Sequence, residues 1–367
     1  NAILVYWLVM LTFKTPFFSR SNPPSPPFSK GGMGGFALFS ALLFVSHPIQ
    51  TQAVTYIVQR FTSLATMLYL LALITYIKSR LSTSHAKRYT LYAISLLSAI
   101  LAMKTKEISF TLPIIIVLYE FMFFEGRFKK RIIYLIPLLL TMLIIPLSII
   151  SIDKPIGDAI GELREASQET DEIPRWSYLF TQFRVIITYI RLLFLPINQN
   201  LDYDYPLYHS FFEPDVFLSL FFLLIILGLG LYLFYRSRIT LNALRLTAFG
   251  IFWFFITLSV ESSIIPIRDV IFEHRVYLPS IGLFFAIITF VFLLADKLKS
   301  RWQKVNRAVV VTLAIVIAVL SITTYARNII WNDWISLWAD VVRKSPQKAR
   351  SYNLLGISYA KQKQFEK

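Results

Sequence analysis

Cysteine is absent from the 367 residues of this chain, which excludes disulfide bonds and thiolate chemistry. Charged residues are also scarce: they make up 16% of the chain, whereas a soluble domain carries about a quarter. Hydrophobic residues reach 56%. This balance does not fit a water-soluble globular protein and indicates a chain that folds in an apolar environment.

The hydrophobic residues are gathered into long runs, of which residues 132–150 and 216–234 are examples. An α-helix needs about twenty apolar residues to cross a bilayer. We therefore predict an all-α, polytopic transmembrane helical bundle. The candidate spans are residues 1–13, 36–46, 62–77, 89–102, 108–124, 132–151, 214–235, 246–260, 276–295 and 308–326.

The net charge of +16 would suit a nucleic-acid partner, but the distribution of the basic residues argues against one. They lie in short loops between apolar runs, at residues 78–88, 125–131, 236–245 and 296–307. Short basic loops are typical of the cytoplasmic side of a membrane. Residues 47–60, 103–107, 152–213, 261–275 and everything after 326 are then predicted to lie outside. The acidic loop at 152–175 agrees with that side.

Two segments are predicted not to span the membrane. Residues 176–196 carry Arg184 and Arg191, which lie seven residues apart and so share one helical face. This favours a helix in the membrane interface within the outer region 152–213, and the alternative is a span with an arginine pair. The Pro/Gly-rich stretch 20–36 is interpreted as an insertion with too little apolar content to pack.

The C-terminal residues change character. Residues 349–367 place Tyr352, Leu355, Gly356 and Tyr359 at the spacing of the first helix of a tetratricopeptide repeat. We predict a membrane domain over residues 1–326 and the start of a repeat array over residues 327–367.

Four outer segments carry polar residues that a simple connection does not need. They include His47 and Arg60 in the first, Lys104, Lys106 and Glu107 in the second, Asp202 and His209 in the third, and Glu261, His274 and Arg275 in the fourth. Each residue alone could be an ordinary helix cap or interfacial anchor. Together they could form a pocket that holds a phosphate. The histidines lack the spacing of metal ligands, so no metal site is predicted.

At these residues the chain resembles a known family. The order of HPIQTQAVTYIVQR, AMKTKEISFTLPIIIVLYE, FEHRVYLPSIG and a repeat array is similar to the transmembrane-and-tetratricopeptide (TMTC-type) protein O-mannosyltransferases and their bacterial relatives, which are GT-C membrane glycosyltransferases. The resemblance implies transfer of a sugar, mannose in the named family, from a polyprenyl phosphate to a protein or glycan acceptor on the outer or lumenal face. It implies a multi-pass protein of a bacterial inner membrane whose repeats lie outside and bind the acceptor.

The same resemblance implies roles for several residues. Arg60 and Lys106 would neutralise the lipid phosphate, with Lys104 as a neighbour, while His47, Glu107, His274 and Arg275 would line the same pocket. The catalytic acid of this class precedes the position of Asn1, so the catalytic residue is unassigned here. Relatives carry an acid where this chain has Thr62.

Two other functions fit parts of the pattern. An O-antigen ligase or polymerase also joins many spans to repeats, but the loop at 152–175 is acidic and lacks the expected histidine. A membrane-anchored repeat scaffold without catalysis would leave the polar outer segments without a role.

Overall fold

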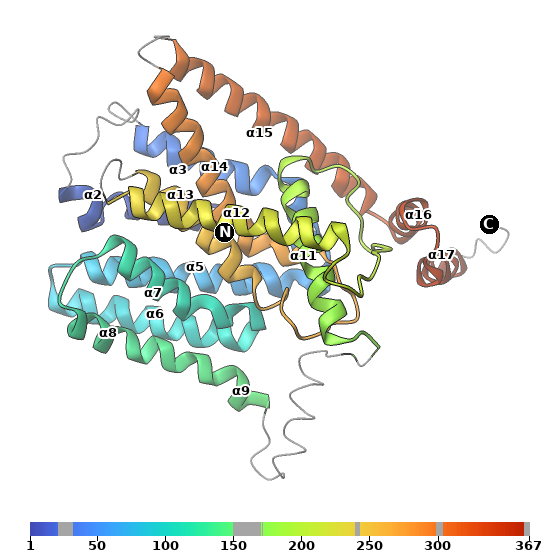
Figure 1. The fold of residues 1–367 in the computed structure, drawn as a ribbon, viewed down its shortest axis with the longest axis horizontal. Helices are drawn as coiled ribbons and strands as arrows, with labels where there is room; N and C mark the ends of the chain where they lie inside the picture. The colour runs from blue at the N-terminus through green and yellow to red at the C-terminus, as the bar shows by residue number, and fades with distance from the viewer. Residues whose placement is uncertain (21–31, 150–169, 171, 239–242, 299–303, 363–367) are drawn as a thin grey trace.

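The structure is a computed structural model that describes residues 1–20, 32–149, 170, 172–238, 243–298 and 304–362. These residues form helices and no strands (Figure 1), which confirms the all-α class. The α-helices, in chain order, are α1 (Ala2–Thr12), α2 (Pro16–Arg20), α3 (Gly32–Ser46), α4 (Thr51–Thr55), α5 (Arg60–Leu81), α6 (His85–Thr105), α7 (Leu112–Phe123), α8 (Phe128–Leu140), α9 (Ile144–Ile149), α11 (Arg175–Phe194), α12 (Pro214–Arg236), α13 (Ala243–Leu258), α14 (Tyr277–Leu298), α15 (Val305–Ile330), α16 (Trp334–Lys344) and α17 (Ala349–Lys361).

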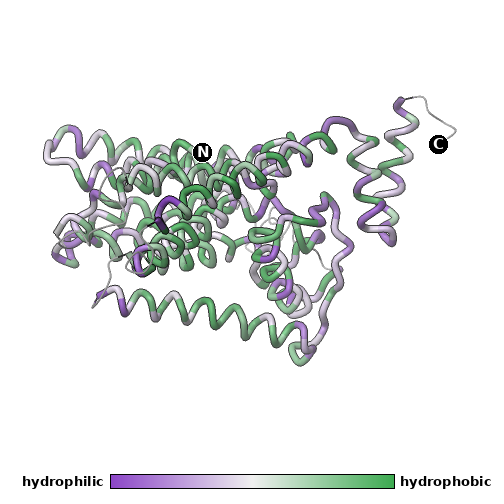
Figure 2. The backbone as a smooth tube through the Cα atoms, turned by 90° about the horizontal axis from the view of Figure 1, so that it is seen from above, coloured by the Kyte–Doolittle hydropathy of each residue, from purple (hydrophilic) through white to green (hydrophobic). Residues whose placement is uncertain are grey.

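Several helices are long and apolar enough to cross a membrane. Five of them pass this test within the described residues: Ile57–Leu81, Phe128–Ser148, Pro214–Arg236, Glu273–Leu298 and Val305–Ile330. A sixth is possible if Met33–Ser46 and Pro48–Thr55, which meet at a bend of 55°, count as one broken span. Hydrophobic residues dominate the length of the helices in Figure 2, whereas α16 and α17 are more mixed. The chain is a multi-pass membrane protein, and its orientation stays a prediction.

Close backbone contact joins α13 to α14. A Cβ atom on Gly250 would lie only 2.3 Å from the carbonyl oxygen of Gly282, and one on Gly282 would lie 2.5 Å from the Trp253 ring. Small residues allow such an approach inside a membrane. Trp253 adds a hydrogen bond from Nε1 to the carbonyl oxygen of Leu278 at 3.0 Å. This packing fixes the relative positions of the loop after α13 and the start of α14.

A second pair, α5 and α6, is joined by a hydrogen bond from the Ser95 hydroxyl to the carbonyl oxygen of Ala72 at 2.7 Å. Since α5 and α6 are consecutive and joined by three residues, the start of α5 lies at the same end of the bundle as the last turn of α6. This arrangement brings residues near 60 close to residues near 106.

A buried charge network lies at the other end of α5. The carboxylate of Glu120 is fully buried in the last turn of α7. It accepts hydrogen bonds from Arg80 at 2.7 and 3.0 Å, from Arg131 at 3.0 Å and from the Tyr76 hydroxyl at 2.9 Å. Two partly buried cations therefore share one fully buried anion, and they connect α5, α7 and α8.

The C-terminal helices α16 and α17 lie beyond one end of the bundle (Figure 1) and have their own small core. Leu337, Trp338 and Val341 of α16 are buried there, and Leu354 and Leu355 of α17 pack against them. The two helices form an antiparallel-type pair joined by a short connection, residues 345–348. The assignment to tetratricopeptide repeats stays a prediction.

The predicted interfacial segment 176–196 forms α11, which is not among the candidate spans. Its buried face docks on the loop between α13 and α14: the Tyr178 hydroxyl donates to the carbonyl oxygen of Glu261, and Gln182 donates to that of Val270. Most of the Pro/Gly-rich insertion 20–36 and of the acidic loop 152–175 lies outside the described residues.

Candidate functional site

The polar stretch 47–60 is an irregular connection, made of short helical turns, between α3 and α5. It consists of the 3-10 turn Pro48–Gln50, the short helix α4 and the 3-10 turn Ile57–Gln59. Its side chains hold distant parts of the fold. Gln50 donates to the Ser280 hydroxyl at 3.0 Å, Gln52 accepts from the backbone N–H of His274 at 2.8 Å, and Thr55 donates to Asn328 at 2.7 Å. The stretch therefore connects α5 to α14 and α15.

Lys106 lies where α6 ends and the chain turns into α7. Its backbone is extended, with φ −161° and ψ 148°, so the side chain leaves the helix axis. The Nζ atom donates to the Thr62 hydroxyl at 2.9 Å and forms an ion pair with Glu261 at 3.1 Å. Both ionic side chains are largely buried, with 14% and 12% exposed. Segments that are far apart in the sequence thus meet at one ion pair.

His274 and Arg275 approach the same place from the start of α14. Both are buried, and His274 lies within electrostatic range of Lys106. Arg275 donates to the carbonyl oxygens of Val270 and Asp269 at 3.0 and 2.9 Å, and it lies within electrostatic range of Glu261. Lys106, Glu261, Thr62, His274 and Arg275 form what we call the polar mouth.

Several buried polar atoms of His274 and of the stretch 47–60 that packs on this part of the chain have no hydrogen-bond partner within the described residues. They are Nδ1 of His274, Nε2 of Gln52 and Oε1 of Gln50. Buried polar groups are normally satisfied by protein or by another polar molecule. His274 and Gln52, which a hydrogen bond joins, therefore retain unused hydrogen-bonding capacity near Lys106.

Arg60 lies at the edge of this region, at the first residue of α5. Its side chain is exposed and donates to the carbonyl oxygen of Val54 at 2.9 Å. It lines an open hollow of about 400 Å³ with Asn1 and Ser63. Its neighbours Ile57 and Phe61 are 72% and 59% exposed, as expected for side chains that face lipid. Arg60 therefore lies among exposed apolar side chains, two residues before Thr62 of the polar mouth.

The other predicted site residues lie apart from the mouth or point away. Both ring nitrogens of His47 are occupied: Nδ1 accepts from the N–H of Ile49, and Nε2 donates to the carbonyl oxygen of Leu193 at 3.1 Å. Lys104 and Glu107 are exposed and make no ion pair within the described part of the chain. The structure thus gives His47 a contact with α11 and leaves Lys104 and Glu107 at the surface.

Glu273, a polar residue of the fourth segment singled out in the sequence, is a buried carboxylate to which no role in the pocket was assigned. Its carboxylate accepts hydrogen bonds from Gln199, from the backbone N–H of Asn200 and from the Tyr203 hydroxyl, at 2.9, 2.8 and 2.6 Å. The outer segment 198–205 is thereby attached to the start of α14. The position of this acid directly before a histidine and an arginine indicates a structural or functional role. The sequence could not identify its partners, because they lie some seventy residues away.

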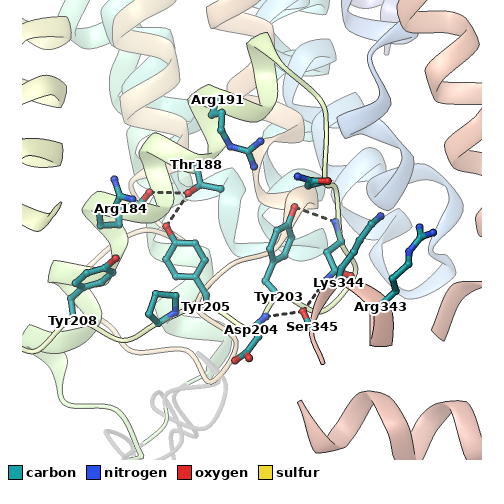
Figure 3. A pocket seen from close by; sticks show the side chains of 13 residues that line it. Arg184, Thr188, Arg191, Tyr203, Asp204, Tyr205, Tyr208, Arg343, Lys344 and Ser345 are labelled. Carbon is teal, nitrogen blue, oxygen red and sulfur yellow. Dashed lines mark hydrogen bonds between the residues drawn. The ribbon is translucent and has the colours of Figure 1, made fainter. Parts of the chain in front are cut away.

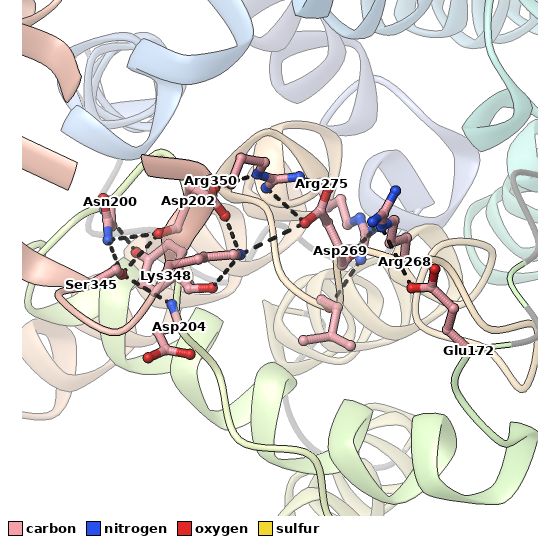
Figure 4. A network of polar contacts seen from close by, with 12 residues as sticks. Glu172, Asn200, Asp202, Asp204, Arg268, Asp269, Arg275, Ser345, Lys348 and Arg350 are labelled. Carbon is pink, nitrogen blue, oxygen red and sulfur yellow. Dashed lines mark hydrogen bonds and ion pairs between the residues drawn. The ribbon is translucent and has the colours of Figure 1, made fainter. Parts of the chain in front are cut away.

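The same outer segment binds the C-terminal helices (Figure 4). Asp202 is buried and pairs with Lys348 and with Arg350, the latter at 2.7 Å. Arg350 also pairs with Asp269 at 2.9 Å. Burial alone would raise the pKa of Asp202, but the hydrogen bonds from Arg350 and Lys348 outweigh it and hold the pKa below its ordinary value of 3.8. The α16–α17 pair is therefore docked on the segment 198–205 and on the loop between α13 and α14, which also carries Glu261.

Asp202→Asn is expected to loosen this docking by about 1 to 2 kcal/mol, after allowance for the exposure of Arg350. Amide hydrogen exchange in α16 and α17 should accelerate about tenfold, while exchange in α5 and α6 should not change. Asp204→Asn is the matched control, because that carboxylate is exposed and makes no ion pair in the described residues. Equal exchange in the two variants would contradict the assignment.

Since the folded-state pKa of Asp202 is depressed, its contribution to the docking of α16 and α17 is complete at neutral pH and is lost as the pH falls below about 4.

Two curated proteins are similar to this chain. It is 27% identical over 370 residues to "Protein O-mannosyl-transferase TMTC3" of Mus musculus, which covers 90% of this chain and 38% of the relative. It is 23% identical over 398 residues to "Protein O-mannosyl-transferase Tmtc3" of Drosophila melanogaster, which covers 95% of this chain and 41% of the relative. No family model and no solved structure matches. The chain thus spans about two fifths of the length of these relatives, and along nearly all of its own length it is related to the TMTC-type proteins.

Proposed function

We propose that this protein is a membrane glycosyltransferase that moves a sugar, in the first instance mannose, from a polyprenyl phosphate to a hydroxyl of a protein or glycan acceptor on the outer or lumenal face. The names of the two relatives support the reaction class. The observation that carries the proposal is the meeting of Lys106, Glu261 and Thr62 at one end of a membrane bundle, beside His274 and Arg275.

This arrangement fits the chemistry of the reaction. The bond between the anomeric carbon and the phosphate oxygen breaks, and the acceptor oxygen forms a new bond to that carbon with inversion. The leaving phosphate gains negative charge, which preorganised cations in a site shielded from water stabilise. Lys106 is such a cation because Glu261 and Thr62 hold its Nζ atom. The proton of the acceptor hydroxyl passes to a general base, for which we assign no residue.

The position of Arg60 fits the capture of a donor from lipid. A polyprenyl chain stays in the bilayer, so its phosphate reaches the protein from the membrane side. Arg60 lies among exposed apolar side chains at the start of α5. Thr62, whose hydroxyl accepts a hydrogen bond from Lys106, follows two residues later. We infer that Arg60 contacts the phosphate first and that Lys106 holds it during transfer.

The test uses the protein at its natural length in liposomes, with radiolabelled mannose on a polyprenyl phosphate as donor. Incorporation of the label into acceptor protein is the expected result. Incorporation from a soluble nucleotide sugar alone would contradict the lipid donor. A complete lack of incorporation from any sugar donor, with an intact fold and bound acceptor, would favour the alternative function of a membrane-anchored repeat scaffold without catalysis.

Glu261→Gln tests the electrostatics of the polar mouth. Removing the carboxylate leaves Lys106 without its anion, so the donor phosphate becomes its counter-ion. The KM for the donor should then fall about fivefold, near 1 kcal/mol, and kcat should fall because the phosphate product is released more slowly. Glu172→Gln is the control, since its pair with Arg268 is at 3.6 Å and highly exposed. A raised KM in the Glu261 variant would show that Glu261 contacts the substrate instead.

A further inference from the structure

A second polar cavity lies apart from the polar mouth. It has a volume of about 710 Å³ and lies between α11, the outer segment 198–208 and the end of α16 (Figure 3). Figure 3 shows arginines of α11 on one side and Arg343 and Lys344 of α16 on the other. None of the residues assigned to the polar mouth lines this cavity.

The cavity carries an excess of positive charge. Its lining holds Arg184, Arg191, Arg343 and Lys344 against one carboxylate, that of Asp204. Arg343 and Lys344 both pair with Asp340, an anion that Arg327 also shares. Glu273 is a second anion within electrostatic range of Arg327 and Lys344, and the three cations still exceed the two carboxylates at this wall.

The two arginines of α11 have unused binding capacity. Arg184 makes a long hydrogen bond to the Ser219 hydroxyl at 3.4 Å, and its Nε atom is buried without a partner within the described residues. Arg191 is exposed and reaches only the carbonyl oxygen of Ile197, at 3.3 Å. Neither forms an ion pair in the part of the chain that the structure describes. Arginine binds phosphate through two parallel N–H groups, and both guanidinium groups retain such donors.

The surroundings of these arginines point to a membrane lipid. Phe194, Leu195 and Ile197, which follow Arg191, are 58%, 60% and 59% exposed, and Phe212 is 85% exposed. Apolar side chains that enter the boundary of the acyl chains, next to arginines at the level of the headgroups, are typical of an interfacial helix. An acidic peptide would account for the arginines but not for this exposed apolar rim.

We propose that this cavity binds the phosphate headgroup of an anionic membrane lipid, with Arg184 and Arg191 as its main ligands. The lipid would hold α11 and the end of α16 at the membrane surface. The tyrosine hydroxyls of the lining are engaged with Asp215, Thr188 and Glu273, so the two arginines are the groups left for the headgroup. The proposal rests on the cavity and its rim and does not depend on the transfer reaction.

The experiment is native mass spectrometry of the protein at its natural length, with lipid added in detergent. Dioleoyl phosphatidylglycerol should bind at least tenfold more tightly than dioleoyl phosphatidylcholine, and inorganic phosphate should bind more weakly than either. The Arg184→Gln/Arg191→Gln variant should lose the preference for the anionic lipid. Arg268→Gln is the matched control: it removes an exposed arginine, 73% exposed, that does not line the cavity, and it should keep the preference.

Two further variants separate binding from folding. Arg191→Gln changes an exposed residue and should weaken the preference without loss of fold. Arg184→Lys/Arg191→Lys keeps the charge, and it should retain part of the preference because lysine cannot bind phosphate bidentately. Equal binding of both lipids by the unchanged protein would overturn the proposal. An undiminished preference in the folded Gln variants, or capture of inorganic phosphate or an acidic peptide without lipid, would overturn it as well.

Discussion

Replacing Lys106 with alanine is expected to lower the rate of sugar transfer by about two to three orders of magnitude while the protein stays folded. The loss follows from the position of the Nζ atom, which Glu261 and Thr62 hold in a largely buried site. Removing one preorganised group that stabilises developing negative charge costs about 10² to 10³ in kcat. Folding should survive, since Glu261 keeps 12% of its side chain in contact with solvent and stays within electrostatic range of Arg275.

The measurement is kcat for transfer from polyprenyl-phosphate mannose in liposomes. Lys87→Ala is the matched control, because Lys87 is exposed at the opposite end of the same helix, α6. Lys104→Ala provides the comparison within the turn. A larger loss for Lys104→Ala than for Lys106→Ala would move the phosphate contact to Lys104, and full activity in both would contradict the proposed site.

The second large effect is expected at the other end of the bundle, where Glu120→Gln should reduce the free energy of unfolding by about 3 to 5 kcal/mol. The amide is nearly isosteric, so packing is kept. It leaves Arg80 and Arg131 without the anion that both contact at 2.7 to 3.0 Å. Breaking one member of a buried charge network costs more than the network contributes, because the remaining charges stay desolvated.

Unfolding in a titration with sodium dodecyl sulfate measures this loss. Glu107→Gln makes the same chemical change at an exposed glutamate on the segment that leads into α7, and it should leave stability unchanged. Tyr76→Phe removes a single hydrogen bond to Glu120 and should cost only about 1 kcal/mol. A Glu120 variant no less stable than the Glu107 variant would contradict the role of the network.

The fold class followed from the sequence because apolar runs have one stable form in a bilayer. Runs such as 216–234 and 308–326 lie within α12 and α15 almost unchanged. The segment 132–151 was predicted as one span, and Phe128–Ser148 does pass as a single candidate span, although a 3-10 turn at Thr141–Leu143 divides it into α8 and α9. Pro137 and Pro146 interrupt the backbone hydrogen bonds on either side of that turn, which counting apolar residues does not register.

The candidate site was predictable only in part. The polar character of Lys106 and Arg60 stood out against apolar neighbours. The partner of Lys106 did not, because Glu261 belongs to a different loop and nothing local in the sequence pairs the two residues. Glu120 lies inside the predicted span 108–124, and a lone carboxylate in an apolar run was a signal of a buried partner. The cavity beside α11 needed the folded chain, since α16 supplies one of its walls.

The length of α5 has a consequence for the whole protein. Arg60 begins this helix and Arg80 lies in its last turn, so about 30 Å separate them at roughly 1.5 Å per residue. That distance equals the hydrocarbon thickness of an average bilayer. In a thinner bilayer α5 must tilt to keep the apolar residues between the two arginines covered by lipid. The length of the lipid chains should therefore change the position of Arg60 relative to the lipid headgroups, and with it the binding of a lipid-linked donor.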